Sequence, residues 1–177
     1  MRYSERPLAI VDLETTGLDA SIHEILDMAV LIVDQKTLKI TDRYSSRIKP
    51  RHIKRAARRA LEVVGYSPRL WQTAVGLETA LHIINEKAKG AILCSTNIYL
   101  ARSFLDAAFK RCGVEDSTSY HHLDLMSVAW TRSSEWKLPR LTLDALCAYH
   151  GIASQPLPRR AREGARTQLA ILQALRA

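Results

Sequence analysis

The sequence predicts an α/β fold built on one five-stranded mixed sheet flanked by helices. Three segments near the N-terminus, 8–14, 24–34 and 43–49, read as strands joined by short connections of turn residues, which indicates an antiparallel meander. After residue 53, helical patterns alternate with the short apolar segment 91–94 and with 122–125, the expected fifth strand. Strands that alternate with helices are typical of layered α/β folds, so these two segments complete the sheet.

Helices are expected wherever apolar residues recur with a period of 3.6. Gly65, Gly90 and Gly113 follow the first three helices, in the position where glycine commonly ends a helix. The expected helices span 54–64, 71–89, 98–112, 126–132, 141–150 and 160–176. The segment 91–94 is continuously apolar, as is usual for a strand covered on both faces.

Length and composition indicate how many domains the chain has and where in the cell we expect it. A chain of 177 residues that is 47% hydrophobic predicts one domain, residues 1–177. No apolar run is long enough to span a membrane, and the first residues lack the apolar stretch of a signal peptide, so we expect no membrane association. Cys94, Cys112 and Cys147 are odd in number and lie in apolar stretches, which indicates free thiols and a reducing, cytoplasmic location.

Basic residues exceed acidic ones and are clustered. The chain has 26 lysines and arginines against 18 acids, a formal charge of +8. Clustered positive charge attracts polyanions, and nucleic acid is the obvious candidate, although solvated helix faces have the same pattern. The first block is Lys49, Arg51, Lys54, Arg55, Arg58 and Arg59, and the second is Arg159, Arg160, Arg162 and Arg166.

Asp12 and Glu14 are the strongest sign of chemistry. They stand two apart at the end of an apolar strand, so both carboxylates point to one face. Two like charges this close are poorly solvated and repel each other, and a divalent cation relieves both penalties. The pair therefore indicates half of a two-metal site.

The motifs of the chain resemble those of the DEDDh 3′-5′ exonucleases, the family of bacterial proofreading subunits and RNase T-like enzymes. Val11-Asp12-Leu13-Glu14-Thr15-Thr16-Gly17 fits the first motif, and the segments 23–29, 48–50, 60–66 and 141–147 extend the resemblance over nearly the whole chain. The resemblance implies a ribonuclease H-like fold, two divalent ions (usually Mg²⁺ or Mn²⁺) held by four carboxylates, and a histidine as general base. Two metal ions held in this way stabilise the attacking and leaving oxygens when a phosphodiester is hydrolysed.

The other catalytic motifs are altered. In the second motif Asn97, Phe104 and Leu105 are in place, but Ala101 occupies the carboxylate position. In the third, Arg159 stands where the histidine belongs and Gly164 where the aspartate belongs. Loss of a general base alone costs roughly 10²–10⁴-fold in rate. We therefore predict a nucleic-acid-binding protein that is catalytically inactive or strongly impaired, and whose metal binding is weak or absent.

Two alternatives remain open. The first is an active exonuclease with a rebuilt metal site that uses Glu163 or Asp106 beside Asp12 and Glu14. Asp106 lies about 140° around the helix from Ala101, and Glu163 about 100° from Gly164, so exposed helix acids are the expectation for both. The second is a protein-interaction subunit of a polymerase or nuclease assembly.

The resemblance and the charge pattern also suggest binding residues for single-stranded DNA or RNA. These are Thr15, Thr16, Asn97, Lys54, Arg55, Arg58, Arg59, Arg159 and Arg162. Tyr66, Tyr99 and Trp71 can stack on bases, although core packing is expected for Trp71. Arg159 or Arg162 can also occupy the space of an ion beside Asp12; equally, they can face solvent or phosphates.

Overall fold

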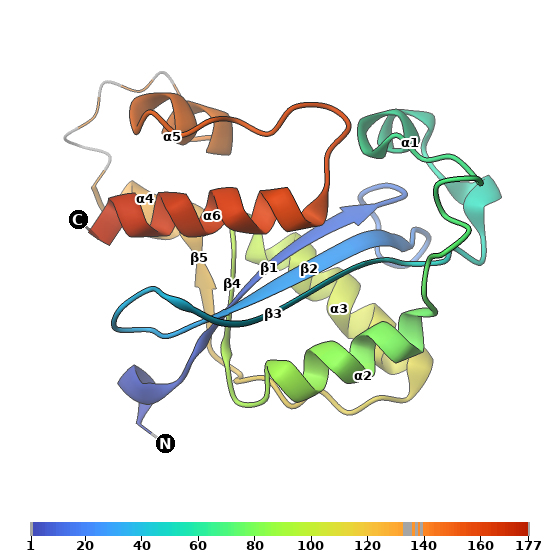
Figure 1. Ribbon diagram of the computed structural model, residues 1–177, viewed down its shortest axis with the longest axis horizontal. Helices are drawn as coiled ribbons and strands as arrows, with labels where there is room; N and C mark the ends of the chain where they lie inside the picture. The colour runs from blue at the N-terminus through green and yellow to red at the C-terminus, as the bar shows by residue number, and fades with distance from the viewer. Residues whose placement is uncertain (1, 133–135, 137, 139, 177) are drawn as a thin grey trace.

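The five predicted strands form one mixed sheet (Figure 1). The computed structural model describes residues 2–132, 136, 138 and 140–176. The strands are β1 (Leu8–Thr15), β2 (Ile25–Val33), β3 (Ile40–Arg47), β4 (Ile92–Ser95) and β5 (His122–Asp124), in the order β3-β2-β1-β4-β5. β1, β2 and β3 form the predicted antiparallel meander, while β4 lies parallel to β1, and β5 parallel to β4. The predicted sheet is therefore confirmed.

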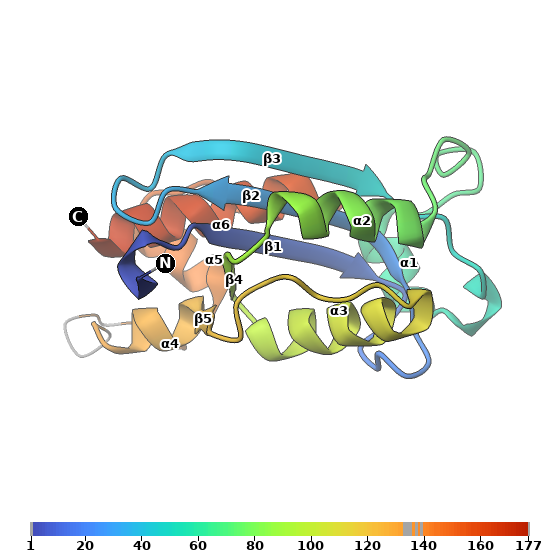
Figure 2. The same cartoon turned by 90° about the horizontal axis from the view of Figure 1, so that it is seen from below.

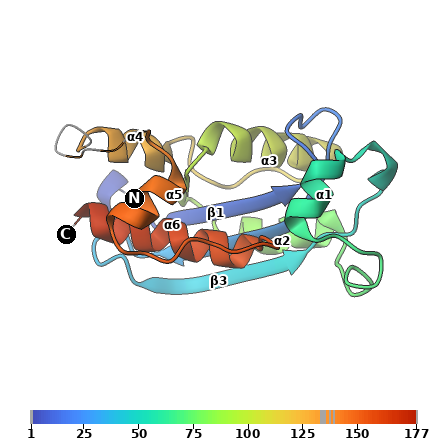
Figure 3. The same cartoon turned by 90° about the horizontal axis from the view of Figure 1, so that it is seen from above.

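Helices cover both faces of the sheet, as Figures 2 and 3 show. On one face lie α2 (Leu77–Lys87) and α3 (Ile98–Cys112), and on the other α4 (Leu125–Trp130), α5 (Leu143–Tyr149) and α6 (Ala161–Arg176). Two short 3₁₀ helices, η1 (Tyr3–Glu5) and η2 (Ile53–Arg55), and the helix α1 (Arg58–Val64) complete the described elements. No helix among the described residues is long and apolar enough to cross a membrane.

Alternation along the strands divides the main core into two layers. Ile10 and Leu31 pack with α4, α5 and α6, whereas Val11 and Met28 pack with α2 and α3. All nine residues of β2 are buried because both of its faces are covered. By the same alternation, every second residue of β1 beyond Ile10 faces α6.

The predicted helix 71–89 begins later than expected, at Leu77. The indole of Trp71 is buried beside Leu26 and Val64, and its Nε1 donates a hydrogen bond to the carbonyl of Leu26 at 3.0 Å. Val75 forms a parallel bridge with Ile48 beyond the end of β3. These contacts hold the segment before α2 in a non-helical conformation, so tertiary packing overrides the apolar periodicity.

The predicted helix 54–64 is also divided, into η2 and α1. Between them, the backbone N–H of Ala57 donates to the carbonyl of Thr16 at 2.8 Å. This bond fixes the start of α1 against the end of β1, where the acidic pair lies.

We predict that Trp71→Ala costs about 3–5 kcal/mol of unfolding free energy, because it removes a large buried side chain and the hydrogen bond to Leu26. Leu70→Ala is the matched control, since the side chain of Leu70 is 43% exposed. Chemical denaturation measures both. A Trp71→Ala loss no larger than the control's would contradict the packing described.

Candidate functional site

Asp12 and Glu14 lie on the face of β1 that α6 covers. Asp27 is the cross-strand neighbour of Glu14 in the antiparallel pair β1–β2, so its carboxylate shares that face. Asp27 is buried, and its carboxylate accepts a hydrogen bond from the backbone N–H of Ala161. The structure therefore collects three acids beneath the start of α6.

Asp12 is bound directly by a glutamine that sequence reasoning missed. Nε2 of Gln168 donates to Oδ1 of Asp12 at 2.6 Å, and Oε1 of Gln168 accepts a hydrogen bond from the backbone N–H of Thr96 at 3.1 Å. Gln168 is fully buried. One signal could have found it: Gln168 is a polar residue within the otherwise apolar or glycine stripe that α6 buries.

Gly164 allows α6 to pack closely on the same carboxylate. A Cβ atom at Gly164 would overlap the carboxylate, because it would stand 2.6 Å from Cγ of Asp12. Ala101, which is buried in α3, lines a hollow of about 110 Å³ together with Asp12. Positions 101 and 164, where the motif resemblance leads us to expect further carboxylates, thus lie near Asp12 and hold an alanine and a glycine.

Arg159 lies just before α6, near Asp12 and Glu14. Its positive charge lowers the pKa of both acids, and it lines one hollow of about 120 Å³ with them. In the described part of the chain, however, no ion pair joins Arg159 to either acid. The direct partner of Asp12 is the Gln168 amide, so the hypothesis that an arginine occupies the space of an ion is not supported.

Arg162 does not reach Asp12 either. Its Nε lies 2.8 Å from Oε1 of Glu163, and it lines hollows on the β3 side of α6. The described contacts of Arg162 therefore do not support it as the partner of the acidic pair, and they agree with the alternative that it faces away from Asp12. Successive residues on a helix are about 100° apart, so Arg162 points to a different side of α6 from the buried Ala161.

Burial shifts the pKa of each of the three acids upward. Burial, together with the nearby charge of Glu14, raises the pKa of Asp12 well above its usual value. Burial also raises the pKa of Glu14 to about 7, against the opposing effect of Arg159, and that of Asp27 to about 6, against the hydrogen bond from Ala161. A buried carboxyl that lacks a cation favours its neutral form.

The donor set does not fit two divalent ions. No group of three or more histidine, cysteine or acidic side chains within the described ranges is arranged to hold a metal. Gln168 donates to Oδ1 of Asp12 and Gly164 packs against Oδ2, so both carboxylate oxygens already have neighbours from α6. Hard cations need several oxygen ligands, and two of the three carboxylates at this site, those of Asp12 and Asp27, already accept hydrogen bonds from Gln168 and from the backbone of Ala161.

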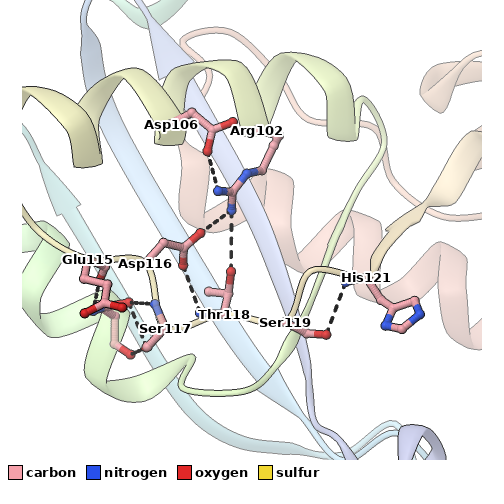
Figure 4. A network of polar contacts seen from close by, with 9 residues as sticks. Arg102, Asp106, Glu115, Asp116, Ser117, Thr118, Ser119 and His121 are labelled. Carbon is pink, nitrogen blue, oxygen red and sulfur yellow. Dashed lines mark hydrogen bonds and ion pairs between the residues drawn. The ribbon is translucent and has the colours of Figure 1, made fainter.

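The acids proposed for a rebuilt site lie elsewhere. Asp106 is exposed and pairs with Arg102, which also contacts Asp116 at 2.5 Å (Figure 4). Glu163 pairs with Arg162 and, at 3.3 Å, with Arg166. Both are helix-surface acids held by neighbouring arginines, so the geometry does not favour the rebuilt site.

A cleft of about 420 Å³ opens beside Glu14. Its walls are mainly apolar, with two arginines, a carboxylate and a threonine at the polar positions. The lining residues are Leu13, Glu14, Thr15, Gly17, Leu18, Ala57, Arg59, Ala60, Val63, Val64, Leu100 and Arg159. An apolar hollow with a few polar groups is the usual form of a ligand site.

The predicted binding residues divide into those near this cleft and those with structural contacts. Thr15, Arg59 and Arg159 line it, and Arg58 is exposed on α1 beside Arg59, both pairing with Glu62. Lys54 and Arg55 are exposed on η2, one turn before α1.

Three other side chains predicted to bind or stack have structural partners. Thr16 is buried, and its hydroxyl accepts a hydrogen bond from the backbone of Glu24. Asn97 caps α3 by accepting from the N–H of Leu100 at 3.1 Å. Trp71 is in the core, as expected, with Tyr66 against it. Tyr99 remains free to stack, since its side chain is 85% exposed.

Comparison with known proteins gives one family and one fold. The RNase T exonuclease family model matches residues 9–166. No curated protein matches the chain by sequence. Exonuclease I of E. coli, solved with a dT13 oligonucleotide, superimposes with a TM-score of 0.82 at 13% identity, covering 97% of this chain and 41% of that one. Exonuclease I of Methylocaldum szegediense gives a TM-score of 0.80 at 16% identity, covering 97% and 40%. The chain thus spans about two fifths of these proteins.

We predict that Gly164→Ala destabilises the protein by about 1–3 kcal/mol, because its Cβ overlaps Asp12. Inside a helix the same change is normally stabilising by about 1 kcal/mol. In the Asp12→Ala background the overlap is gone, so the substitution should become neutral or stabilising. Gly76→Ala is the matched control, since a Cβ there meets no atom closer than 3.9 Å. Additive effects in the double-mutant cycle would show that the contact is absent.

We predict that stability falls as pH rises from about 4 to about 7 because of the buried acids. Their pKa values are raised on folding, so the folded state binds more protons than the unfolded state across this window. Glu14→Gln should therefore be more stable than wild type at pH 8, by on the order of 1 kcal/mol, and close to wild type near pH 4. Denaturation in EDTA measures the difference. A variant that is less stable at pH 8 would contradict the protonation described.

Proposed function

The chain belongs to the DEDDh-type 3′-5′ exonuclease family, and we propose that it is a nucleic-acid-binding member whose catalytic centre no longer assembles. One observation carries the proposal: α6 packs directly on Asp12 through Gly164 and Gln168. In active members the corresponding region is expected to hold two ions and their ligands. Here the backbone of a glycine and the amide of a glutamine occupy the sides of Asp12.

The chemistry of hydrolysis lacks its proton acceptor as well. Arg159 stands at the position of the general base, and a guanidinium does not release its proton in the working range of proteins. It cannot activate a water molecule, but it can donate several hydrogen bonds to a phosphate oxygen. The exchange therefore favours phosphate binding over phosphate hydrolysis.

The cleft supports the binding half of the proposal. Arg59 and Arg159 stand at its polar positions, apolar side chains form its walls, and Tyr99 is exposed on the neighbouring start of α3. Bases stack on aromatic and apolar surfaces while phosphates pair with arginines, so the cleft suits the end of a single strand. The E. coli protein crystallised with dT13 has the same fold, which adds support for single-stranded DNA as one ligand.

A protein partner is the second candidate. Exonuclease I has been solved in complex with an SSB C-terminal peptide, with a TM-score of 0.79 and 13% identity to this chain. This chain spans 41% of that protein, so a corresponding partner here is supported only by the shared fold.

A nuclease assay tests the catalytic half. We predict that labelled single-stranded and double-stranded DNA and RNA remain uncleaved with Mg²⁺ or Mn²⁺, and that Asp12→Ala behaves like wild type. Exonuclease I serves as the positive control. Robust metal-dependent cleavage that disappears in Asp12→Ala would overturn the proposal of a silent centre.

An oligonucleotide titration tests the binding half. Anisotropy of a labelled single strand should report binding that weakens steeply with added salt. Arg58→Gln/Arg59→Gln should weaken it, whereas Arg69→Gln/Lys110→Gln, which removes equal charge from exposed positions away from the cleft, should have little effect. Failure to retain any oligonucleotide at low salt would refute nucleic-acid binding.

A further inference from the structure

A second basic surface lies on the opposite side of the α6 start from the cleft. Figure 3 shows α6 running beside the edge strand β3. Two neighbouring hollows of about 360 and 280 Å³ follow this line and share Ser45 and Arg162; together they are called the β3–α6 groove. Its lining residues are Asp27, Leu31, Arg43, Tyr44, Ser45, Ser46, Arg47, Arg160, Arg162 and Arg166.

The register of the sheet explains the row of charges on β3. Arg43, Ser45 and Arg47 pair with residues 31, 29 and 27 of β2, whose side chains face α6. Alternate residues of a strand share a face and stand about 6.6 Å apart, so Arg43 and Arg47 lie at intervals along one wall.

The opposite wall belongs to α6. Arg162 and Arg166 are four residues apart, so they lie on the same side of the helix, about 6 Å apart along its axis. Strand and helix thus present two facing rows of guanidinium groups along the groove.

The acids in the groove do not neutralise these rows. Glu163 pairs with both Arg162 and Arg166, and Asp27 lies buried at the base. Arg43 forms no ion pair with any residue that the structure describes. Five arginines line the groove against the carboxylate of Asp27 and that of the neighbouring Glu163, so the groove retains net positive charge.

Two of these arginines are held in place by the fold. Nη1 of Arg47 donates to the carbonyl of Leu70 at 2.6 Å, and its guanidinium lies 4.8 Å from the centre of the Trp71 ring. Nη1 of Arg160 donates to the carbonyl of Val64, also at 2.6 Å. Fixed guanidinium groups lose less entropy when an anion binds, which favours a built site over a merely charged surface.

We propose that the β3–α6 groove binds the phosphate backbone of a nucleic-acid strand, as a second anionic site separate from the cleft. Planar guanidinium groups bind phosphates through paired hydrogen bonds, and charges repeated along a groove match a polymer of phosphates. The class of ligand rests on the proposed function, whereas the location does not depend on the cleft.

Anisotropy titrations of the full chain with a labelled thymidine 20-mer test this site across a salt series. Arg43→Gln/Arg166→Gln removes one exposed charge from each wall, and Lys89→Gln/Lys110→Gln is the matched control on the face of α2 and α3. The groove variant should bind roughly tenfold more weakly at 50 mM salt, and its log–log salt slope should fall by about 1.4, the value for two phosphate contacts. The control should change the affinity less than about twofold.

The outcomes separate this inference from the proposed function. If wild type binds and the groove variant matches the control, the groove site is refuted and cleft binding stands. If wild type binds nothing, both fail. A polyglutamate peptide that displaces the oligonucleotide in wild type, but not in the groove variant, would identify the groove as an acidic-peptide site and overturn the phosphate assignment. Matching thermal melts of the variants confirm that each is folded.

Discussion

The burial of Asp12 beneath α6 is the constraint on which the site depends. A carboxyl on the covered face of β1 has lost its water, so a cation, a hydrogen-bond donor or a proton must compensate its charge. In the described structure, the side-chain amide of Gln168 donates a hydrogen bond to Asp12. Burial also raises the pKa of Asp12, which favours its protonated form. Gly164 makes this solution possible, because any side chain there would meet the carboxylate.

The altered residues of the site are consistent with one another. In the silent centre that we propose, Ala101 and Gly164 stand at the positions where the motif resemblance puts two carboxylates, and Arg159 brings a fixed positive charge toward Asp12 and Glu14. Under this proposal, fewer charges in the centre reduce the need for cations, and α6 packs closely on Asp12. The arginines meanwhile lie around the start of α6, in the cleft and in the β3–α6 groove, where phosphates can reach them.

Sequence reasoning succeeded where local signals agree with tertiary contacts. Helix 98–112 was predicted with its observed limits, because Asn97 caps it and Gly113 ends it. The expected helix over 71–76 was wrong, since Trp71 packs into the core and the backbone follows β3. The positions of Ala101 and Gly164 beside Asp12 followed from the motif spacing. Gln168 and Asp27 were missed because their roles arise only when α6 and β2 meet β1.

The most direct test is a crystal structure of the protein grown with Mn²⁺, with anomalous diffraction collected near the manganese edge. The account predicts no anomalous peak beside Asp12 and an amide of Gln168 still within hydrogen-bond distance of its carboxylate. Two peaks about 3.5–4 Å apart, with Gln168 displaced and α6 moved away, would contradict it, because that spacing belongs to a working two-metal centre.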